Sequence, residues 1–146
     1  MKILILNGPS LNLLGKRNPD VYGNHTLEDI QKALNKKAQQ INIELIFAQS
    51  NHEGELIDTL QKNSSCDGVI FNPGAFTHTS IAIADALESI DIPTVEVHLS
   101  NIYAREEFRS HSYIAPIAIG QISGFGLSGY LAALDLINEY LQNKND

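Results

Sequence analysis

Short apolar runs alternate with segments of helical periodicity along this chain, and that alternation restricts the folds open to it. Continuous apolar runs, typical of strands buried on both faces, cover residues 2–7, 41–48, 67–72, 93–100 and 116–120. The spacing of apolar side chains predicts helices beginning at residue 26, at about 53, at 77 or 78 and at about 127, and a short helix at about 103–109. Strand and helix therefore follow one another along almost the whole chain.

This order predicts an α/β fold with one parallel sheet that helices cover on both faces. The most economical topology is a flavodoxin-like three-layer sandwich of five parallel strands in the order 2-1-3-4-5. Because no linker or repeat interrupts the pattern, residues 1–146 are expected to form a single domain. Ligands of such sheets bind beyond the carboxyl ends of the strands, at the switch point between strands one and three. The site is therefore expected at the loops after residues 7, 72 and 99.

Composition narrows the classes of partner. The chain has 17 acidic and 10 basic residues and a formal net charge of -7, which argues against nucleic acid or an anionic membrane as its main partner. The single Cys66 cannot form an internal disulfide, as suits a reducing compartment. The apolar run at 3–6 is too short for a signal peptide, and no stretch approaches the roughly 18 apolar residues of a membrane span. We expect a cytoplasmic protein.

The loop after the first strand argues against phosphate-binding modules of this fold. Pro9 removes a backbone donor from the place where flavodoxins cradle phosphate, and the Gly-Lys-Ser/Thr ending of a P-loop is absent. Asn7 and Asn72 stand where a phosphoreceiver domain would need acidic side chains. A flavodoxin-like nucleotide- or flavin-binding module is kept as the alternative function.

The apolar run at 93–100 carries a carboxylate and an imidazole with one residue between them. Residues two apart on a strand share a face, so Glu96 and His98 are expected to point the same way. A carboxylate beside an imidazole fixes its tautomer and raises its basicity, which makes His98 a candidate proton donor. A structural ion pair is the alternative interpretation, and a metal site lacks an evident third ligand.

The three arginines of the chain, Arg17, Arg105 and Arg109, all fall near the expected site. The last two are spaced i, i+4 and would share one face of the predicted short helix. Arginine suits the recognition of planar anions, although solvated surface arginines are the ordinary alternative. Asn72 at a strand end and His78 at a helix start could each form a hydrogen bond with a ligand. The position of all three arginines near the expected site, with none elsewhere, favours a role in that site.

Five segments in this order resemble type II 3-dehydroquinate dehydratase over nearly the whole chain. The segments are ILNGPSLNLLGKRNPDVYG, QSNHEGELID, FNPGAFTHTSIAIADAL, PTVEVHLSNIYAREEFRSHSY and GFGLSGYLAAL. The resemblance implies a carbon–oxygen lyase that dehydrates 3-dehydroquinate to 3-dehydroshikimate in the shikimate pathway, towards aromatic amino acids. It implies a single catalytic domain that needs no metal or organic cofactor.

The resemblance also assigns roles by position. Tyr22 is similar to the general base, Arg17 to its partner on a lid, and His98 to the general acid. Glu96 would orient His98, and Asn12 would hold a water at the developing enolate oxygen.

The remaining assignments concern substrate binding. Asn72 with the backbone of Leu99 and Ser100 resembles the site for the substrate carboxylate. His78 and Arg109 resemble contacts to the ring hydroxyls, and Arg105 lies near the tyrosine. Asp85 is similar to a residue that reaches a neighbouring subunit.

Dehydration beside a ketone needs a base, a group that stabilises the enolate, and an acid. Apart from Lys16, no lysine falls at a predicted strand carboxyl end, so a Schiff-base route is disfavoured. A neutral phenol is a poor base, with an ordinary pKa of about 10, but nearby arginines favour the phenolate. The loop at 15–26 is therefore expected to be a lid that brings Tyr22 and Arg17 onto the substrate. Another lyase or hydrolase that uses the same His–Glu pair stays open.

The helix predicted at about 77–90 is apolar almost all round between residues 81 and 87, with Asp85 isolated in that run. A helix that covers one sheet face in a monomer should have a polar outer side. A neighbouring subunit would supply a second apolar surface and a partner for the carboxylate. We expect a closed homo-oligomer, and the resemblance implies trimers gathered into a dodecamer.

Overall fold

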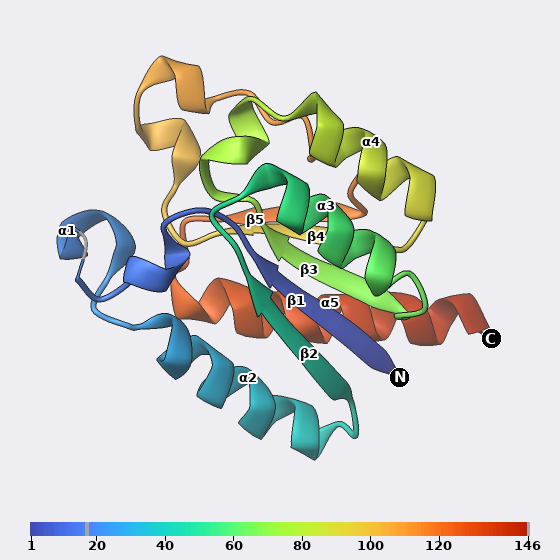
Figure 1. The fold of residues 1–146 in the computed structure, drawn as a ribbon. Coiled ribbons are helices and arrows are strands. Elements are labelled where there is room, and N and C mark those ends of the chain that lie inside the picture. The colour runs from blue at the N-terminus through green and yellow to red at the C-terminus, as the bar shows by residue number, and fades with distance from the viewer. Residues whose placement is uncertain (17, 146) are drawn as a thin grey trace.

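The computed structural model describes residues 1–16 and 18–145, and its centre is one five-stranded sheet (Figure 1). The strands run parallel in the order β2-β1-β3-β4-β5, which confirms the predicted topology. Their bounds are β1 Lys2–Asn7, β2 Glu44–Gln49, β3 Gly68–Asn72, β4 Thr94–His98 and β5 Gly120–Ser123.

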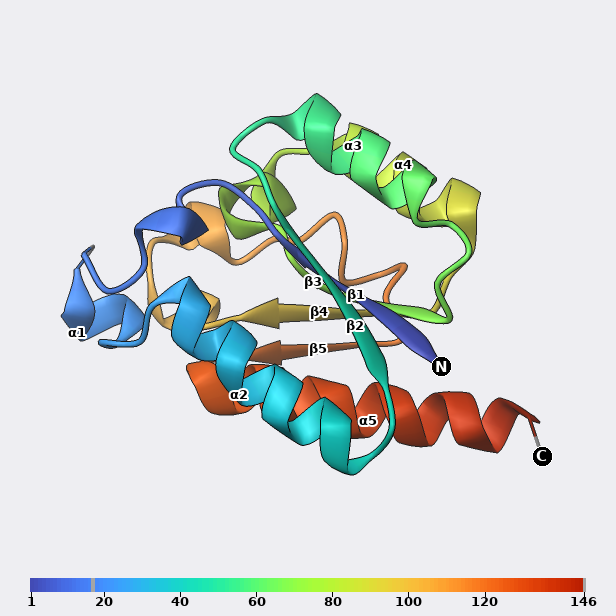
Figure 2. The same cartoon turned by 60° about the horizontal axis from the view of Figure 1, so that its bottom comes forward.

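Helices cover both faces of this sheet, giving the three expected layers (Figure 2). Helices α2 (Leu27–Gln40) and α5 (Leu127–Asn145) lie on one face, where Ile3, Ile5 and Val97 are buried against them. Helices α3 (Glu53–Lys62) and α4 (Ile81–Ile90) lie on the other, over Leu4 and Leu6. Alternate residues of β1 thus enter opposite cores, as a strand buried on both faces requires. Within residues 1–16 and 18–145, we find no helix with the length and apolar character needed to span a membrane.

The start of α2 follows the sequence pattern. The Thr26 side chain accepts a hydrogen bond from Asp29 N, and the Asp29 side chain accepts one from Thr26 N. This reciprocal capping box satisfies two backbone donors that the first turn of a helix leaves unpaired.

Three predicted boundaries are wrong. Strand β2 begins at Glu44 because Ile41 and Asn42 form a turn in which Asn42 has φ 55°. Helix α4 begins only at Ile81, because Ser80 caps it by accepting from Ile83 N. Residues 74–78 form a separate 3-10 helix.

The fifth strand is Gly120–Ser123 and not 116–120. Ile117 N and Ala118 N both donate to the carbonyl oxygen of Ile114, so the chain forms a turn there and not a strand.

The predicted short helix at 103–109 is also wrong. The segment forms two 3-10 helices, Ile102–Ala104 and Glu107–Arg109, and Arg105 between them has extended backbone angles. The i, i+4 spacing of Arg105 and Arg109 therefore does not place them on one helical face. Both reach the same region by way of two separate turns.

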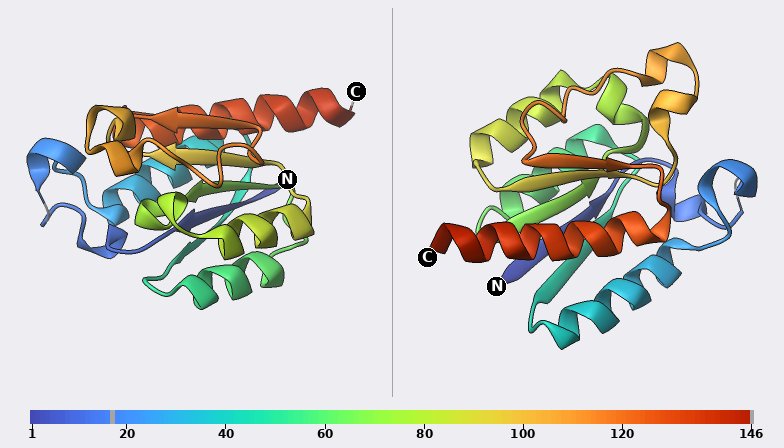
Figure 3. Two further views of the ribbon diagram at one scale, coloured as in Figure 1. Left: turned by 90° about the horizontal axis from the view of Figure 1, so that it is seen from above. Right: turned by 180° about the vertical axis from the view of Figure 1, so that it is seen from behind.

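Loops from β1 and β3 touch at the switch point of the sheet. Gly8 N donates to Asn72 O over 2.8 Å, and a Cβ on Gly8 would lie 2.4 Å from Pro73 O. Only glycine lets the two backbones approach so closely. This contact fixes the two loops that the fold offers to a ligand. Figure 3 shows the carboxyl ends of the strands meeting at the end of the molecule where α1 lies.

The Gly8→Ala variant should lose about 1 to 3 kcal/mol of unfolding free energy, because the added methyl meets backbone atoms that cannot yield cheaply. Gly54→Ala is the matched control. Gly54 lies within α3, and an added Cβ has no atom within 4 Å, so this change should stabilise by roughly 0.5 to 1 kcal/mol. Urea unfolding of both variants measures the difference. Equal stability of the two variants would contradict the close-approach argument.

Candidate active site

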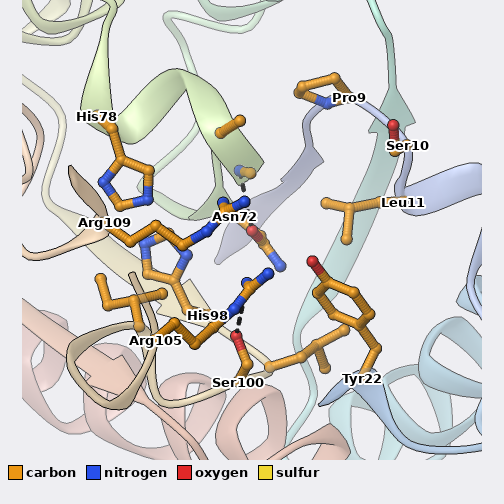
Figure 4. A pocket seen from close by; sticks show the side chains of 14 residues that line it. Pro9, Ser10, Leu11, Tyr22, Asn72, His78, His98, Ser100, Arg105 and Arg109 are labelled. Carbon is orange, nitrogen blue, oxygen red and sulfur yellow. Dashed lines mark hydrogen bonds between the residues drawn. The ribbon is translucent and has the colours of Figure 1, made fainter. Parts of the chain in front are cut away.

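A pocket opens where the loops after β1, β3 and β4 converge, as the switch-point argument predicts. Eight of the residues expected from sequence line it: Tyr22, Asn72, His78, His98, Leu99, Ser100, Arg105 and Arg109. Pro9, Ser10, Leu11, Gly74, Ala75 and Ile102 complete the wall. Figure 4 shows Tyr22 on one side of this pocket and His78 and Arg109 on the other, with Arg105 between Tyr22 and His98.

The pair predicted on β4 is present at the pocket floor. His98 Nε2 lies 2.7 Å from Glu96 Oε1, and both side chains are buried, Glu96 completely. Burial alone would raise the pKa of Glu96, but hydrogen bonds from His98, Thr77 and Ser112 outweigh it and hold that pKa below its ordinary value. Glu96 is therefore ionised at neutral pH and accepts a hydrogen bond from Nε2 of the imidazole. Nδ1 is the ring nitrogen that is not bonded to Glu96.

Sequence reasoning missed the two hydroxyls that hold Glu96. Thr77 comes from the 3-10 helix after β3, and Ser112 from the loop before β5. Neither carries a motif, and only the tertiary structure brings positions 77, 96 and 112 together. The one available signal was Glu96 itself, since a buried carboxylate requires donors.

A second buried network holds Asn72. Its Oδ1 accepts from Gly74 N over 3.1 Å, and its Nδ2 donates to the Tyr130 hydroxyl over 2.9 Å. That hydroxyl in turn donates to Asn7 Oδ1 over 2.6 Å, and complete burial raises the pKa of Tyr130, which keeps it protonated. These bonds fix the orientation of the Asn72 amide, so one N–H of Nδ2 stays available to a ligand. Sequence reasoning missed Tyr130, which lies on α5, 58 positions from Asn72 along the chain.

His78 presents a fixed tautomer. Its Nδ1 lies 2.7 Å from the carbonyl oxygen of His111, which can only accept, so the Nδ1 proton is donated there. Burial lowers the pKa of His78, and the ring stacks beside that of His98 at a centroid distance of 6.4 Å. A neutral His78 with an accepting Nε2 suits a hydroxyl group of a ligand.

Two arginines, Arg105 and Arg109, line the pocket. Arg105 Cζ lies 5.3 Å from the centroid of the Tyr22 ring, whose residue ends the short helix α1 (Pro19–Tyr22). Arg109 Nε donates to Glu106 Oε2 over 2.7 Å, which orients its side chain. A guanidinium over the face of a phenol ring is attracted to it by a cation–π interaction. The pocket therefore offers an ionisable oxygen and an imidazole to an anionic ligand.

The structure does not bring every predicted residue to this pocket. Asn12 is exposed in the 3-10 helix Leu11–Leu13 and does not line the pocket. Asp85 is exposed on α4 and also lies outside the lining. The prediction for Arg17 falls outside the described residues. Across residues 1–16 and 18–145, no three His, Cys, Asp or Glu side chains are grouped so that they could hold a metal ion.

Comparisons with known proteins agree with the site. The family model described as Dehydroquinase class II matches residues 1–138. A 3-dehydroquinate dehydratase from Trichodesmium erythraeum is 56% identical over 99% of this chain and 97% of that protein. A type II dehydroquinase structure from Butyrivibrio crossotus superposes with a TM-score of 0.93 at 48% identity, covering 94% of this chain and 97% of the other. One from Propionibacterium acnes gives 0.89 at 39% identity, covering 93% and 94%.

Acid should destabilise the fold partly through Glu96. Its folded-state pKa lies below the ordinary value of 4.5, so ionised Glu96 stabilises the fold above that pH, and this contribution is lost as the pH falls through the folded-state pKa. Glu96→Gln cannot titrate there. Urea unfolding between about pH 7 and about pH 3 should show a shallower acid loss in this variant than in the wild type.

The other carboxyls with lowered pKa values, Asp29 and Glu106, remain in both proteins and cancel in the comparison. Parallel stability curves for wild type and Glu96→Gln would contradict the assignment of that acid loss to Glu96.

Proposed function

This chain belongs to the class II dehydroquinase family, and from that membership and the pocket we infer how its residues divide the work. The reaction is the dehydration of 3-dehydroquinate to 3-dehydroshikimate, a step of the shikimate pathway. Family membership favours this lyase over the nucleotide- or flavin-binding module. The observation that best supports the division of labour is the fully buried Glu96 bonded to His98, in a pocket whose other side carries Tyr22.

His98 is the proposed general acid. It sits at the end of β4, and the ionised Glu96 accepts a hydrogen bond from Nε2 and fixes the ring orientation. The leaving hydroxyl of the substrate would take its proton from this ring. The strand holds the imidazole in a fixed place, which suits an acid that must reach the leaving hydroxyl of a substrate bound in a fixed position.

Tyr22 is the proposed base, taking the proton next to the substrate ketone. Arg105 Cζ lies 5.3 Å from the centroid of its ring, and Arg17 of the same loop is proposed as the second cation beside it. Closure of the loop at 15–26 over the substrate would exclude water and strengthen both interactions. Asn12 is proposed to hold a water at the enolate oxygen once that loop has closed, since its exposed position leaves it outside the pocket wall.

The substrate would be held at three points. The N–H of Asn72, with the backbone of Leu99 and Ser100, is proposed to bind the carboxylate. His78 and Arg109 are proposed to contact the ring hydroxyls, which suits the accepting Nε2 of His78. No metal or organic cofactor has a role in this scheme.

At the level of the whole molecule, we propose that residues 1–146 form one catalytic domain working in the cytoplasm. We also propose a homo-oligomer, a dodecamer built as a tetramer of trimers. Helix α4 supports this, because its outer side exposes Ile81 by 57% together with Ala82 and Asp85, while Ile83 and Leu87 face the core. Asp85 is proposed to support the site of a neighbouring subunit.

Tyr22→Phe keeps the ring and removes the ionisable oxygen. We expect turnover of 3-dehydroquinate to fall by at least ~10²-fold with little change in KM, because the base acts only in the chemical step. The conjugated enone of the product gives an absorbance signal for the assay. Tyr140→Phe, on the exposed side of α5, is the matched control and should keep wild-type turnover. Near-normal turnover of Tyr22→Phe would remove Tyr22 from the role.

Asp85→Ala tests the assembly. Light scattering should find the wild type as a closed oligomer at micromolar concentration, and the variant should bind substrate more weakly because a neighbouring site loses its support. Glu88→Ala, exposed on the same helix, is the control and should behave as the wild type. A fully active monomer would refute the proposal, and an intact oligomer with weakened binding would assign Asp85 to recognition more than to assembly.

A further inference from the structure

Two hydroxyl side chains lie against the buried carboxylate below His98. Ser112 Oγ is 3.0 Å from Glu96 Oε1 and 3.0 Å from Oε2, and Thr77 Oγ1 donates to Oε1. Thr77 is completely buried and Ser112 nearly so. Neither residue lines the pocket, so neither can touch a substrate.

The backbone fixes the direction in which these hydroxyls donate. Ser112 Oγ accepts from Ile114 N over 3.0 Å and from Ala115 N over 2.9 Å, which uses both of its acceptor positions. Thr77 lies 2.8 Å from Ser112 Oγ but cannot donate to it, so the Thr77 proton goes to Glu96. The Ser112 proton has the charged carboxylate as its strongest acceptor.

This arrangement decides where the proton between Glu96 and His98 resides. Oε1 faces His98 Nε2 over 2.7 Å and already receives the Thr77 proton. Hydrogen bonds donated to a carboxylate stabilise its ionised form against the protonated form. The shared proton is therefore held on Nε2 of the imidazole.

We propose that Thr77 and Ser112 are positioning residues that keep Glu96 ionised and the proton on His98 Nε2, so that Nδ1 is the nitrogen that exchanges a proton with the substrate. The inference rests on the proposed role of His98 as general acid. It assigns to two residues outside the pocket a function in setting the tautomer of the acid.

The chain also ties the two hydroxyl segments together independently of Glu96. Tyr113 N donates to Thr77 O over 2.8 Å, and His78 Nδ1 donates to the carbonyl oxygen of His111. Loss of the Thr77 hydroxyl therefore leaves the backbone of both segments clamped, whereas Ser112→Ala also removes the acceptor of Ile114 N and Ala115 N. A functional effect of the Thr77 change therefore reports on the hydrogen bond and not on a displaced loop, and Ser112→Ala serves as supporting evidence.

Other titrating and charged groups near Glu96 and His98 do not account for the effect expected when a hydroxyl is removed. His78, Arg105, Arg109 and Tyr22 share the pocket with His98. Burial lowers the pKa of His78, and arginines stay charged throughout the accessible range. Within the described parts of the chain, His78, Arg105 and Arg109 form no side-chain hydrogen bond with Thr77 or Ser112, so removal of either hydroxyl leaves their own hydrogen bonds intact.

The test uses Thr77→Val, which removes the hydroxyl and keeps the shape, with Thr77→Ser as the conservative rescue and Ser112→Ala as the second site. We expect Thr77→Val and Ser112→Ala each to lower kcat by about 10- to 100-fold, the scale for a hydrogen bond to a charged group, with KM changed by less than about two-fold. Thr77→Ser should restore most of the kcat. Equal kcat in Thr77→Val and wild type would overturn the proposal, as would a Thr77→Ser variant no better than Thr77→Val.

The pH profile supplies a readout that a structural role would not move. The hydroxyls stabilise the deprotonated, net negative Glu96–His98 pair more than the protonated, neutral pair. Their removal should therefore raise the proton affinity of the pair and shift the basic limb of the kcat profile to higher pH. An unshifted limb in both Thr77→Val and Ser112→Ala would contradict the proposal.

A nitrogen-15 spectrum of His98 separates this inference from the proposed function, since it needs no turnover. The wild type should show a protonated Nε2, and Thr77→Val should move that resonance towards the unprotonated form. Identical Nε2 states would overturn the inference even if the wild type is fully active. Absence of enone from the wild type would instead overturn the proposed function, with the spectrum still testing the tautomer.

Discussion

A carboxylate without solvent contact in the middle of β4 imposes the strongest requirement on this structure. An isolated buried charge is highly unfavourable, so Glu96 has to be surrounded by donors. The imidazole of His98 supplies one, and hydroxyls from two distant segments supply the others. The 3-10 helix after β3 and the loop before β5 must therefore meet beside β4. One of these segments, the 3-10 helix after β3, also supplies Gly74, Ala75 and His78 to the wall of the pocket.

The fold separates a rigid half of the pocket from a loop-borne half. His98 and Asn72 stand at the ends of adjacent central strands, and buried networks fix both side chains. Tyr22 stands instead on a short helix within the loop after β1. A proton donor on the sheet and a base on a loop suit a reaction in which loop closure completes the site only when substrate is present.

Sequence patterns predicted the features that depend on periodicity. The period of two placed Glu96 and His98 on one face, and the strand–helix alternation gave the strand order and the three loops that form the pocket. The apolar run at 116–120 was misread because Ile117 and Ile119 are partly exposed in a turn, where hydrophobicity alone resembles a strand. Arg105 and Arg109 reach the pocket as predicted, although by two 3-10 turns and not by one helix.

The residues that sequence missed act through tertiary contacts. Thr77, Ser112 and Tyr130 are ordinary residue types in unremarkable surroundings, and their partners lie between 16 and 123 positions away. No local spacing encodes such contacts. Their role is visible only once the charge or amide that they satisfy is located.

Mass spectrometry after borohydride treatment in the presence of excess 3-dehydroquinate tests the central claim most directly. The proposed mechanism has Tyr22 form an enolate by removing a proton and His98 donate a proton to the leaving hydroxyl, with no covalent bond between substrate and protein. It therefore predicts an unchanged protein mass and full enone-forming activity after the reagent is removed. A mass increase located on a lysine, with loss of activity, would show a trapped iminium and contradict it.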